Sequence, residues 1–163
     1  MTNQEMLSHI DHTQLKAFAT WGDIKMLCDE AVLYKTASVC IPSCYVKRVK
    51  DAYQDSLNIC TVVGFPLGYA NTEAKVAETK KAIEDGASEI DMVINISDVK
   101  NGLYDAVEEE IKTLKATCGD KILKVIIETC YLSKEEKIAM CKAVTNAGAD
   151  YITPISEEII SQM

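Results

Sequence analysis

An aspartate and a lysine stand within two extended, mostly apolar runs of this sequence, where the two residue types could do carbonyl chemistry together. The run 89–95 contains Asp91, and the run 122–129 contains Lys124. A buried lysine with a lowered pKa can attack a carbonyl carbon and form a Schiff base, while a nearby aspartate moves the protons. The alternative is an ion pair between Asp91 and Lys124 that has only a structural role. Neither interpretation requires a metal or a cofactor, and we predict none.

Six extended runs alternate with five amphipathic helical patterns along the chain. The extended runs are about 9–13, 36–41, 58–64, 89–95, 122–129 and 150–155, and the helical patterns are 23–34, 43–53, 72–85, 103–117 and 133–147. We predict Asp23, Asn71 or Thr72, and Ser133 as N-caps, the last one opening a capping box. Strict alternation predicts a parallel α/β sheet, either open and flavodoxin-like or closed into a barrel.

The residues within the predicted strands alternate between polar and apolar, which favours the barrel. A central strand of an open sheet is covered on both faces and is apolar throughout, whereas a barrel strand turns one face inward. One face of these strands would carry the polar set Asp11, Thr13, Ser38, Cys40, Glu89, Asp91, Asn95, Lys124 and Glu128. These side chains are therefore expected to meet in one interior.

Length, charge and cysteine spacing limit the classes of protein to which this chain could belong. The 163 residues, 48% apolar and 26% charged, are expected to form a single domain, 1–163. The net charge of −8 disfavours binding to nucleic acid or to an anionic membrane. No membrane span or signal peptide is recognisable, so we expect a cytoplasmic protein. Cys40 and Cys44 lack a second pair of ligands, and no metal site is predicted.

Five segments resemble, in order, the strand motifs of the deoxyribose-phosphate aldolase family. They are residues 10–16, 38–42, 62–68, 86–95 and 123–129, and the resemblance runs from about residue 7 to 152. It implies a TIM (β/α)₈ barrel and a class I aldolase, a lyase of carbohydrate degradation and deoxyribonucleotide catabolism. This enzyme cleaves 2-deoxy-D-ribose 5-phosphate to glyceraldehyde 3-phosphate and acetaldehyde. The resemblance also implies roles for five residues, namely proton relay for Asp91, a lysine of the site for Lys124, and pocket lining for Asp11, Thr13 and Cys40.

The resemblance ends at residue 153. The family continues with Lys-Thr-Ser-Thr-Gly, whose lysine forms the Schiff base, whereas this chain has Thr153 and then Pro154. Proline also removes a hydrogen-bond donor from what should be a central strand. A full barrel needs about 200–250 residues. We therefore predict a truncated barrel of about six βα units with a divergent segment at 153–163, lacking the last two units, their second essential lysine and the phosphate-binding loops.

Two functional hypotheses remain open, with a third, weaker one behind them. The first is a deoxyribose-phosphate aldolase with a small phosphosugar or aldehyde substrate, assembled as a homo-oligomer. The second is a catalytically inactive fragment or pseudo-enzyme that serves as an assembly module through its open sheet edges. The third is another small-molecule lyase on a related barrel. Without the partner lysine, we expect Lys124 to stay charged and paired with Asp91 rather than to act as a nucleophile.

Overall fold

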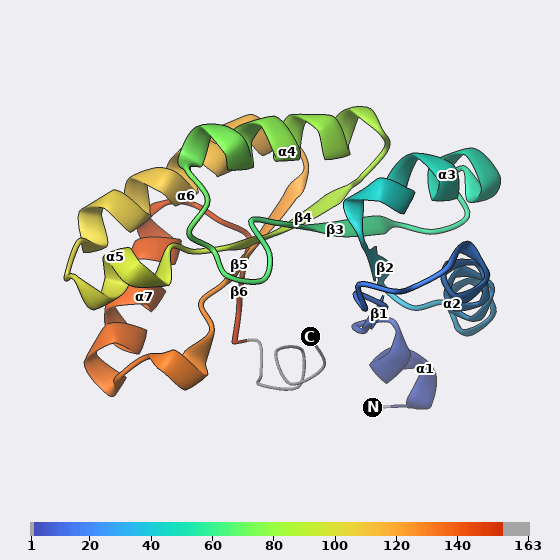
Figure 1. Ribbon diagram of the computed structural model, residues 1–163. Coiled ribbons are helices and arrows are strands. Elements are labelled where there is room, and N and C mark those ends of the chain that lie inside the picture. Colours follow the sequence, from blue (N-terminus) through green and yellow to red (C-terminus); the bar gives the residue numbers. More distant parts are fainter. Residues whose placement is uncertain (1, 155–163) are drawn as a thin grey trace.

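The computed structural model describes residues 2–154, which form one curved parallel sheet with helices along its outside (Figure 1). Each strand pairs in parallel with its neighbour in sequence, so that the order across the sheet is that of the chain. The six strands are β1 (Asp11–Thr13), β2 (Ser38–Ile41), β3 (Ile59–Val63), β4 (Glu89–Val93), β5 (Ile122–Ile126) and β6 (Tyr151–Thr153). This curled half-barrel confirms the predicted six βα units of a TIM-barrel fold.

The five long helices lie where helical periodicity placed them, with no bound differing by more than two residues. They are α2 (Trp21–Tyr34), α3 (Ser43–Tyr53), α4 (Thr72–Glu84), α6 (Tyr104–Cys118) and α7 (Lys134–Asn146). Three short helices were not predicted, because one or two turns are too few for a period of 3.6 to be visible. These are α1 (Asn3–Leu7), α5 (Ile96–Lys100) and the 3₁₀ helix η1 (Thr129–Tyr131).

The helix caps correct one prediction and confirm another. Asp23 is not the N-cap of α2, because Thr20 has that position and its hydroxyl accepts from the backbone N–H of Asp23 at 3.3 Å. Asp23 is the third helical residue, and its carboxylate accepts from the backbone N–H of Thr20, completing a capping box. Ser133 caps α7 as predicted, in a box with Glu136. Asn71 stands at the N-cap of α4 without a side-chain hydrogen bond.

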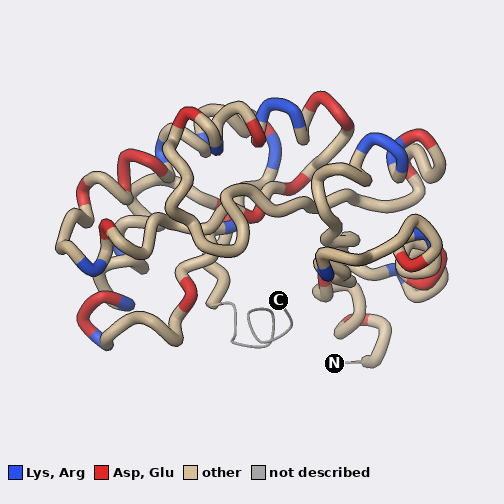
Figure 2. The backbone as a smooth tube through the Cα atoms, viewed as in Figure 1, with Lys and Arg blue, Asp and Glu red and all other residues tan. Residues whose placement is uncertain are grey.

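The apolar core lies between the sheet and the helices, on the convex side. Ile90 and Met92 of β4 and Leu123 and Val125 of β5 are buried there, within a cluster that includes residues of all five long helices. Burying each such side chain contributes about 1.5–3 kcal/mol. Charged residues of both signs are distributed mainly along the helices (Figure 2). The alternate strand residues face the concave side, where part of the predicted polar set gathers, namely Asp11, Ser38, Glu89, Asp91 and Lys124.

The end of the described chain has a defined place in the sheet. Thr153 is the last residue of β6 and pairs in register with Ile126, and its carbonyl accepts from the N–H of Ile127 at 3.0 Å. Residues 155–163 of the predicted divergent segment lie outside the described residues. Within residues 2–154, β1 pairs only with β2, and β6 only with β5. No helix in this part of the chain combines the length and apolarity needed to cross a membrane.

Candidate functional site

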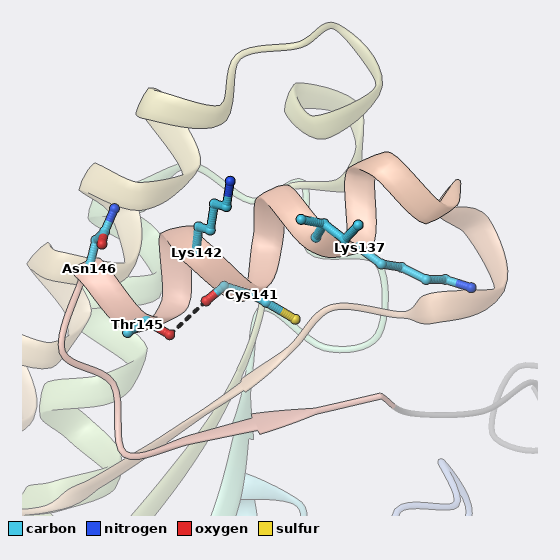
Figure 3. A pocket seen from close by; sticks show the side chains of 6 residues that line it. Lys137, Cys141, Lys142, Thr145 and Asn146 are labelled. Carbon is cyan, nitrogen blue, oxygen red and sulfur yellow. Dashed lines mark hydrogen bonds between the residues drawn. The ribbon is translucent and has the colours of Figure 1, made fainter.

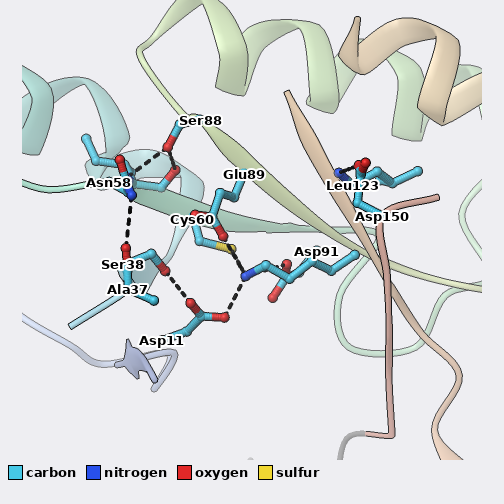
Figure 4. Close-up of polar contacts among 12 residues, drawn as sticks. Asp11, Ala37, Ser38, Asn58, Cys60, Ser88, Glu89, Asp91, Leu123 and Asp150 are labelled. Atoms are coloured by element: carbon cyan, nitrogen blue, oxygen red, sulfur yellow. Dashed lines mark hydrogen bonds and ion pairs between the residues drawn. The ribbon is translucent and has the colours of Figure 1, made fainter. Parts of the chain in front are cut away.

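Lys124 lies at the centre of a polar cluster on the concave face of the sheet. Its Nζ atom is 2.5 Å from Asp11 Oδ2, 2.8 Å from Glu89 Oε2 and 3.4 Å from Asp91 Oδ1. Figure 4 shows these three carboxylates converging from two strands, Asp11 from β1 and both Glu89 and Asp91 from β4. The side chain of Lys124 is only 9% exposed, so a single buried ammonium group faces three acids.

The strand register places most of these groups side by side. Asp91 of β4 is the register partner of Lys124 on β5, and Glu89 lies two residues before Asp91 on the same face. Asp11 belongs to β1, at the other end of the sheet order, and reaches Lys124 only because the sheet curls. Ser38 on β2 donates its hydroxyl to Asp11 Oδ1 at 2.7 Å and holds that carboxylate in place.

Two cysteines extend the cluster onto β2 and β3. Cys60 Sγ is 3.7 Å from Lys124 Nζ, and Cys40 is the register partner of Cys60. Both thiols are buried. Of the five predicted site residues, the structure therefore gathers Asp11, Cys40, Asp91 and Lys124, joined by Glu89, Ser38 and Cys60.

Thr13 is the predicted site residue that does not join the cluster. Its side chain is exposed, and its hydroxyl donates to the backbone carbonyl of Asp11 at 2.9 Å. Glu89 and Ser38 could have been included from the sequence, because alternation already placed both on the inward face. Cys60 had no such signal, since it stands in the almost wholly apolar run of residues 58–64.

The charge states in the cluster follow from burial and from the excess of carboxylates. Burial alone would lower the pKa of Lys124, but the charges and hydrogen bonds of its neighbours, Asp91, Asp11 and Glu89 among them, outweigh burial and raise that pKa. Burial raises the pKa of Asp91, and the charge of Lys124 offsets only part of this rise. Lys124 is therefore a charged group at neutral pH rather than a free amine, and Asp91 is a carboxyl group that holds its proton more readily than usual.

A cavity of about 290 Å³ reaches Lys124 from the amino-terminal side of the strands. TIM-barrel active sites lie at the opposite, carboxyl-terminal end, so this opening is not the usual entrance of the fold. Thr153 lines the same cavity as Lys124, which places position 153 inside the same interior. The lining residues are Ser8, His9, Asp11, Ala37, Glu89, Ile122, Lys124, Tyr151, Ile152 and Thr153.

A second hollow, of about 390 Å³, lies on the surface of α7 (Figure 3). All its lining residues come from that one helix, and the hydrogen bond drawn there runs within the helix, from the Thr145 hydroxyl to the carbonyl of Cys141. Among residues 2–154, no second element contributes a polar group to its lining, so the concave cluster is the better candidate site. The lining residues are Lys137, Ile138, Cys141, Lys142, Thr145 and Asn146.

Proteins of known sequence share this chain's residues over almost its whole length. A deoxyribose-phosphate aldolase from Clostridium botulinum is 69% identical over 152 residues, which cover 93% of this chain and 69% of the relative. A deoxyribose-phosphate aldolase from Clostridioides difficile is 58% identical over 149 residues, covering 91% of this chain and 68% of the relative. The chain thus spans about two thirds of the length of these relatives.

Solved structures share the fold. A structure from Coccidioides immitis, described as a candidate deoxyribose-phosphate aldolase, superposes with a TM-score of 0.90 at 39% identity, covering 93% of this chain and 60% of that one. The tetrameric deoxyribose phosphate aldolase of Aeropyrum pernix gives 0.86 at 28% identity, covering 93% and 64%. The model of the DeoC/LacD family aldolases matches residues 6–153. With its half-barrel, its matched length and these relatives, the chain belongs to the DeoC/LacD family of aldolases.

Proposed function

We propose that this chain carries the acid–base half of a deoxyribose-phosphate aldolase site. The reaction is the retro-aldol cleavage of 2-deoxy-D-ribose 5-phosphate to glyceraldehyde 3-phosphate and acetaldehyde. The observation that carries the proposal is the contact of Lys124 with three carboxylates, inside the half-barrel of an aldolase family. We infer the substrate from the names of the relatives and the proton-transfer roles from the residues of the cluster.

The cluster suits the proton transfers of an aldol cleavage. A hydroxyl proton must leave as the carbon–carbon bond breaks and glyceraldehyde 3-phosphate forms, and a proton must be added to the carbon that becomes the methyl group of acetaldehyde. Asp91 has a raised pKa, which brings it closer to the operating pH of a general acid or base. Charged Lys124 would stabilise the negative charge that develops on the substrate oxygen.

Thr153 favours a second candidate function, in which this chain binds substrate but does not cleave it. In the resemblance described above, the Schiff-base lysine stands at position 153, and the structure has threonine there, in the same cavity as Lys124. A hydroxyl group cannot form an imine. Lys124 is a poor substitute, because a protonated amine is not nucleophilic.

Replacing Thr153 with lysine tests both candidates. We expect the unmodified chain to cleave 2-deoxyribose 5-phosphate no faster than a buffer blank, and Thr153→Lys to cleave it measurably, as followed by release of glyceraldehyde 3-phosphate. Thr153→Met, which is long but has no amine, is the matched control. Adding Asp91→Asn to Thr153→Lys should reduce the rate by about a hundredfold or more.

The outcomes separate the two candidates. Turnover by the unmodified chain, well above the blank, would show that Thr153 does not silence the site. A folded Thr153→Lys protein without turnover, checked by circular dichroism and by borohydride trapping with acetaldehyde, would contradict the proposed half-site.

Self-association and a cytoplasmic setting belong to the same proposal. The outer edges of β1 and β6 have no strand partner among residues 2–154, and open edges favour pairing with a second copy. All seven cysteines are thiols, as is usual in a reducing compartment. We expect light scattering to give a dimer or larger assembly, and a clean monomer of 18.0 kDa at micromolar concentration would refute this.

A further inference from the structure

Cys40, Cys60 and Asp91 bring three potential metal ligands together in the concave interior. One ligand atom from each, the two Sγ atoms and a carboxylate oxygen, lies within 4.8 Å of the others. All three residues are buried, with exposed fractions of 3%, 0% and 7%. Among residues 2–154, this is the one group of three or more histidine, cysteine or acidic side chains that converges in this way.

The sheet itself builds this geometry. Cys40 on β2 pairs in register with Cys60 on β3, and Asp91 on β4 pairs with Val62, two residues beyond Cys60 on the same face. The three ligands thus stand on three adjacent strands rather than on loops. Rigid strands hold a site more accurately than loops do.

We propose that Cys40, Cys60 and Asp91 form a binding site for a thiophilic divalent d¹⁰ cation such as Zn²⁺. Two cysteine sulfurs and one carboxylate oxygen are ligands that zinc accepts, at about 2.0–2.3 Å, and three protein ligands leave a fourth tetrahedral position for water. Hard cations such as Mg²⁺ prefer an all-oxygen set and are excluded by the two sulfurs.

The charges around the site favour a cation despite the nearby ammonium group. Asp11, Glu89 and Asp91 all face Lys124, so three carboxylates and one ammonium leave a net charge of −2 when all are ionised. Asp11 and Glu89 make the two shorter contacts with Lys124. Asp91 Oδ1 makes only the longer one and has no hydrogen-bond partner in the described part of the chain. Asp91 is therefore the carboxylate that can turn to a cation while Lys124 stays neutralised.

The cation must displace protons from the thiols. The hydrogen bond with Cys40 and then burial raise the pKa of Cys60 well above its usual value, so the Cys60 thiol is protonated in the cation-free protein. Binding releases these protons to solvent, and the affinity should rise with pH. If the proposed function holds, a bound cation also occupies Asp91 and suppresses proton transfer, which makes this an inhibitory site.

Cadmium is a suitable probe, because thiolate–cadmium bonds give an ultraviolet charge-transfer band. The parent protein for the experiment carries serine at the exposed cysteines Cys44, Cys130 and Cys141, and is kept reduced. We expect one Cd²⁺ per chain with this band. Cys60→Ser should weaken binding by about tenfold or more, since even the loss of a residue that only supports a ligand commonly costs that much. Cys118→Ser, which removes a buried thiol outside the site, is the matched control and should bind as the parent does.

Protection from alkylation provides a second measurement that requires no variant in the core. In the parent protein, Cd²⁺ should slow the modification of Cys40 and Cys60 by a small maleimide, with Cys28 and Cys118 unaffected. Equal Cd²⁺ affinity in the parent and in Cys60→Ser, absence of the charge-transfer band in the parent, or protection of all four buried cysteines alike would each overturn the proposal. None of these readouts depends on aldolase activity.

Discussion

Replacing Lys124 with methionine is expected to lower the free energy of unfolding by roughly 3–5 kcal/mol at about pH 7.5. The substitution keeps most of the volume of the side chain but removes the ammonium group that contacts Asp11, Glu89 and Asp91. Three largely buried carboxylates would then face one another without a cation. A loss of this size is a large fraction of the stability of a typical domain, about 5–15 kcal/mol, and urea unfolding monitored by circular dichroism measures it.

The loss should shrink as the pH falls. Burial raises the pKa of Asp91, and without the charge of Lys124 to offset part of this rise, Asp91 would hold its proton still more tightly in the folded than in the unfolded chain. Stability from such groups is present at low pH and is lost as the pH rises through the folded-state pKa, so Lys124→Met should cost less at about pH 5 than at about pH 7.5.

Two further variants show whether charge is the cause. Adding Asp91→Asn to Lys124→Met removes one of the unpaired carboxylates and should recover part of the loss. Lys112→Ala removes only an exposed pair with Glu108 on α6 and should leave stability unchanged within error. Lys124→Met as stable as the unmodified chain at both pH values would mean that the cluster does not depend on its lysine.

Replacing Lys75 with methionine should also lower the free energy of unfolding by roughly 3–5 kcal/mol. Lys75 is completely buried on α4, and its Nζ donates to Glu110 Oε2 at 2.9 Å and to the carbonyl of Val93 at 2.8 Å. Burial lowers the pKa of Lys75, and the charge of Glu110 offsets only part of this. Methionine would leave Glu110 buried without its cation and the end of β4 without this hydrogen bond.

The atoms packed around Lys75 leave no room for a simple rearrangement of the side chain at this position. A Cβ atom added at Gly64, which has a φ of +64°, would lie 2.8 Å from Lys75 Cε, so glycine is needed there both for the turn and for this close approach. The backbone N–H of Gly64 donates in turn to Glu78 of α4. The buried ammonium therefore connects α4, α6 and β4, two residues beyond Asp91.

A double variant separates the ion pair from packing. Lys75→Met combined with Glu110→Gln removes both charges, and we expect it to be more stable than Lys75→Met alone, giving a clear coupling free energy. Lys80→Met makes the same substitution at an exposed position of the same helix and should have no measurable effect. Equal stability of Lys75→Met and Lys80→Met would contradict the structural role assigned to Lys75.

The burial of Lys75 does not follow from the helical periodicity of the sequence. The helix was predicted at 72–85, and residues 75, 79 and 82 recur at the spacing of its buried face. From its residue type alone, a lysine at the first of these positions is expected to lie at the surface. Its burial depends on Glu110, which is 35 residues away, and sequence spacing does not reveal which helices pack together.

The sequence by itself determined the order of the elements, the inward faces of β2, β4 and β5, and the threonine at position 153. These follow from local rules, since a period of two or of 3.6 and the capping residues act within a few residues of the chain. The pairing of Asp91 with Lys124 was also within reach, because consecutive parallel strands of this fold lie side by side.

Only the tertiary structure decided how many acids face Lys124. In a flat sheet, β1 and β5 would stand four strand spacings apart, about 19 Å. Curling brings Asp11 to 2.5 Å from Lys124 across 113 residues of sequence. The curvature comes from accumulated strand twist and from helices packed on one side, which no single segment encodes. That same curvature closes the interior in which Lys124 meets three carboxylates and keeps its charge.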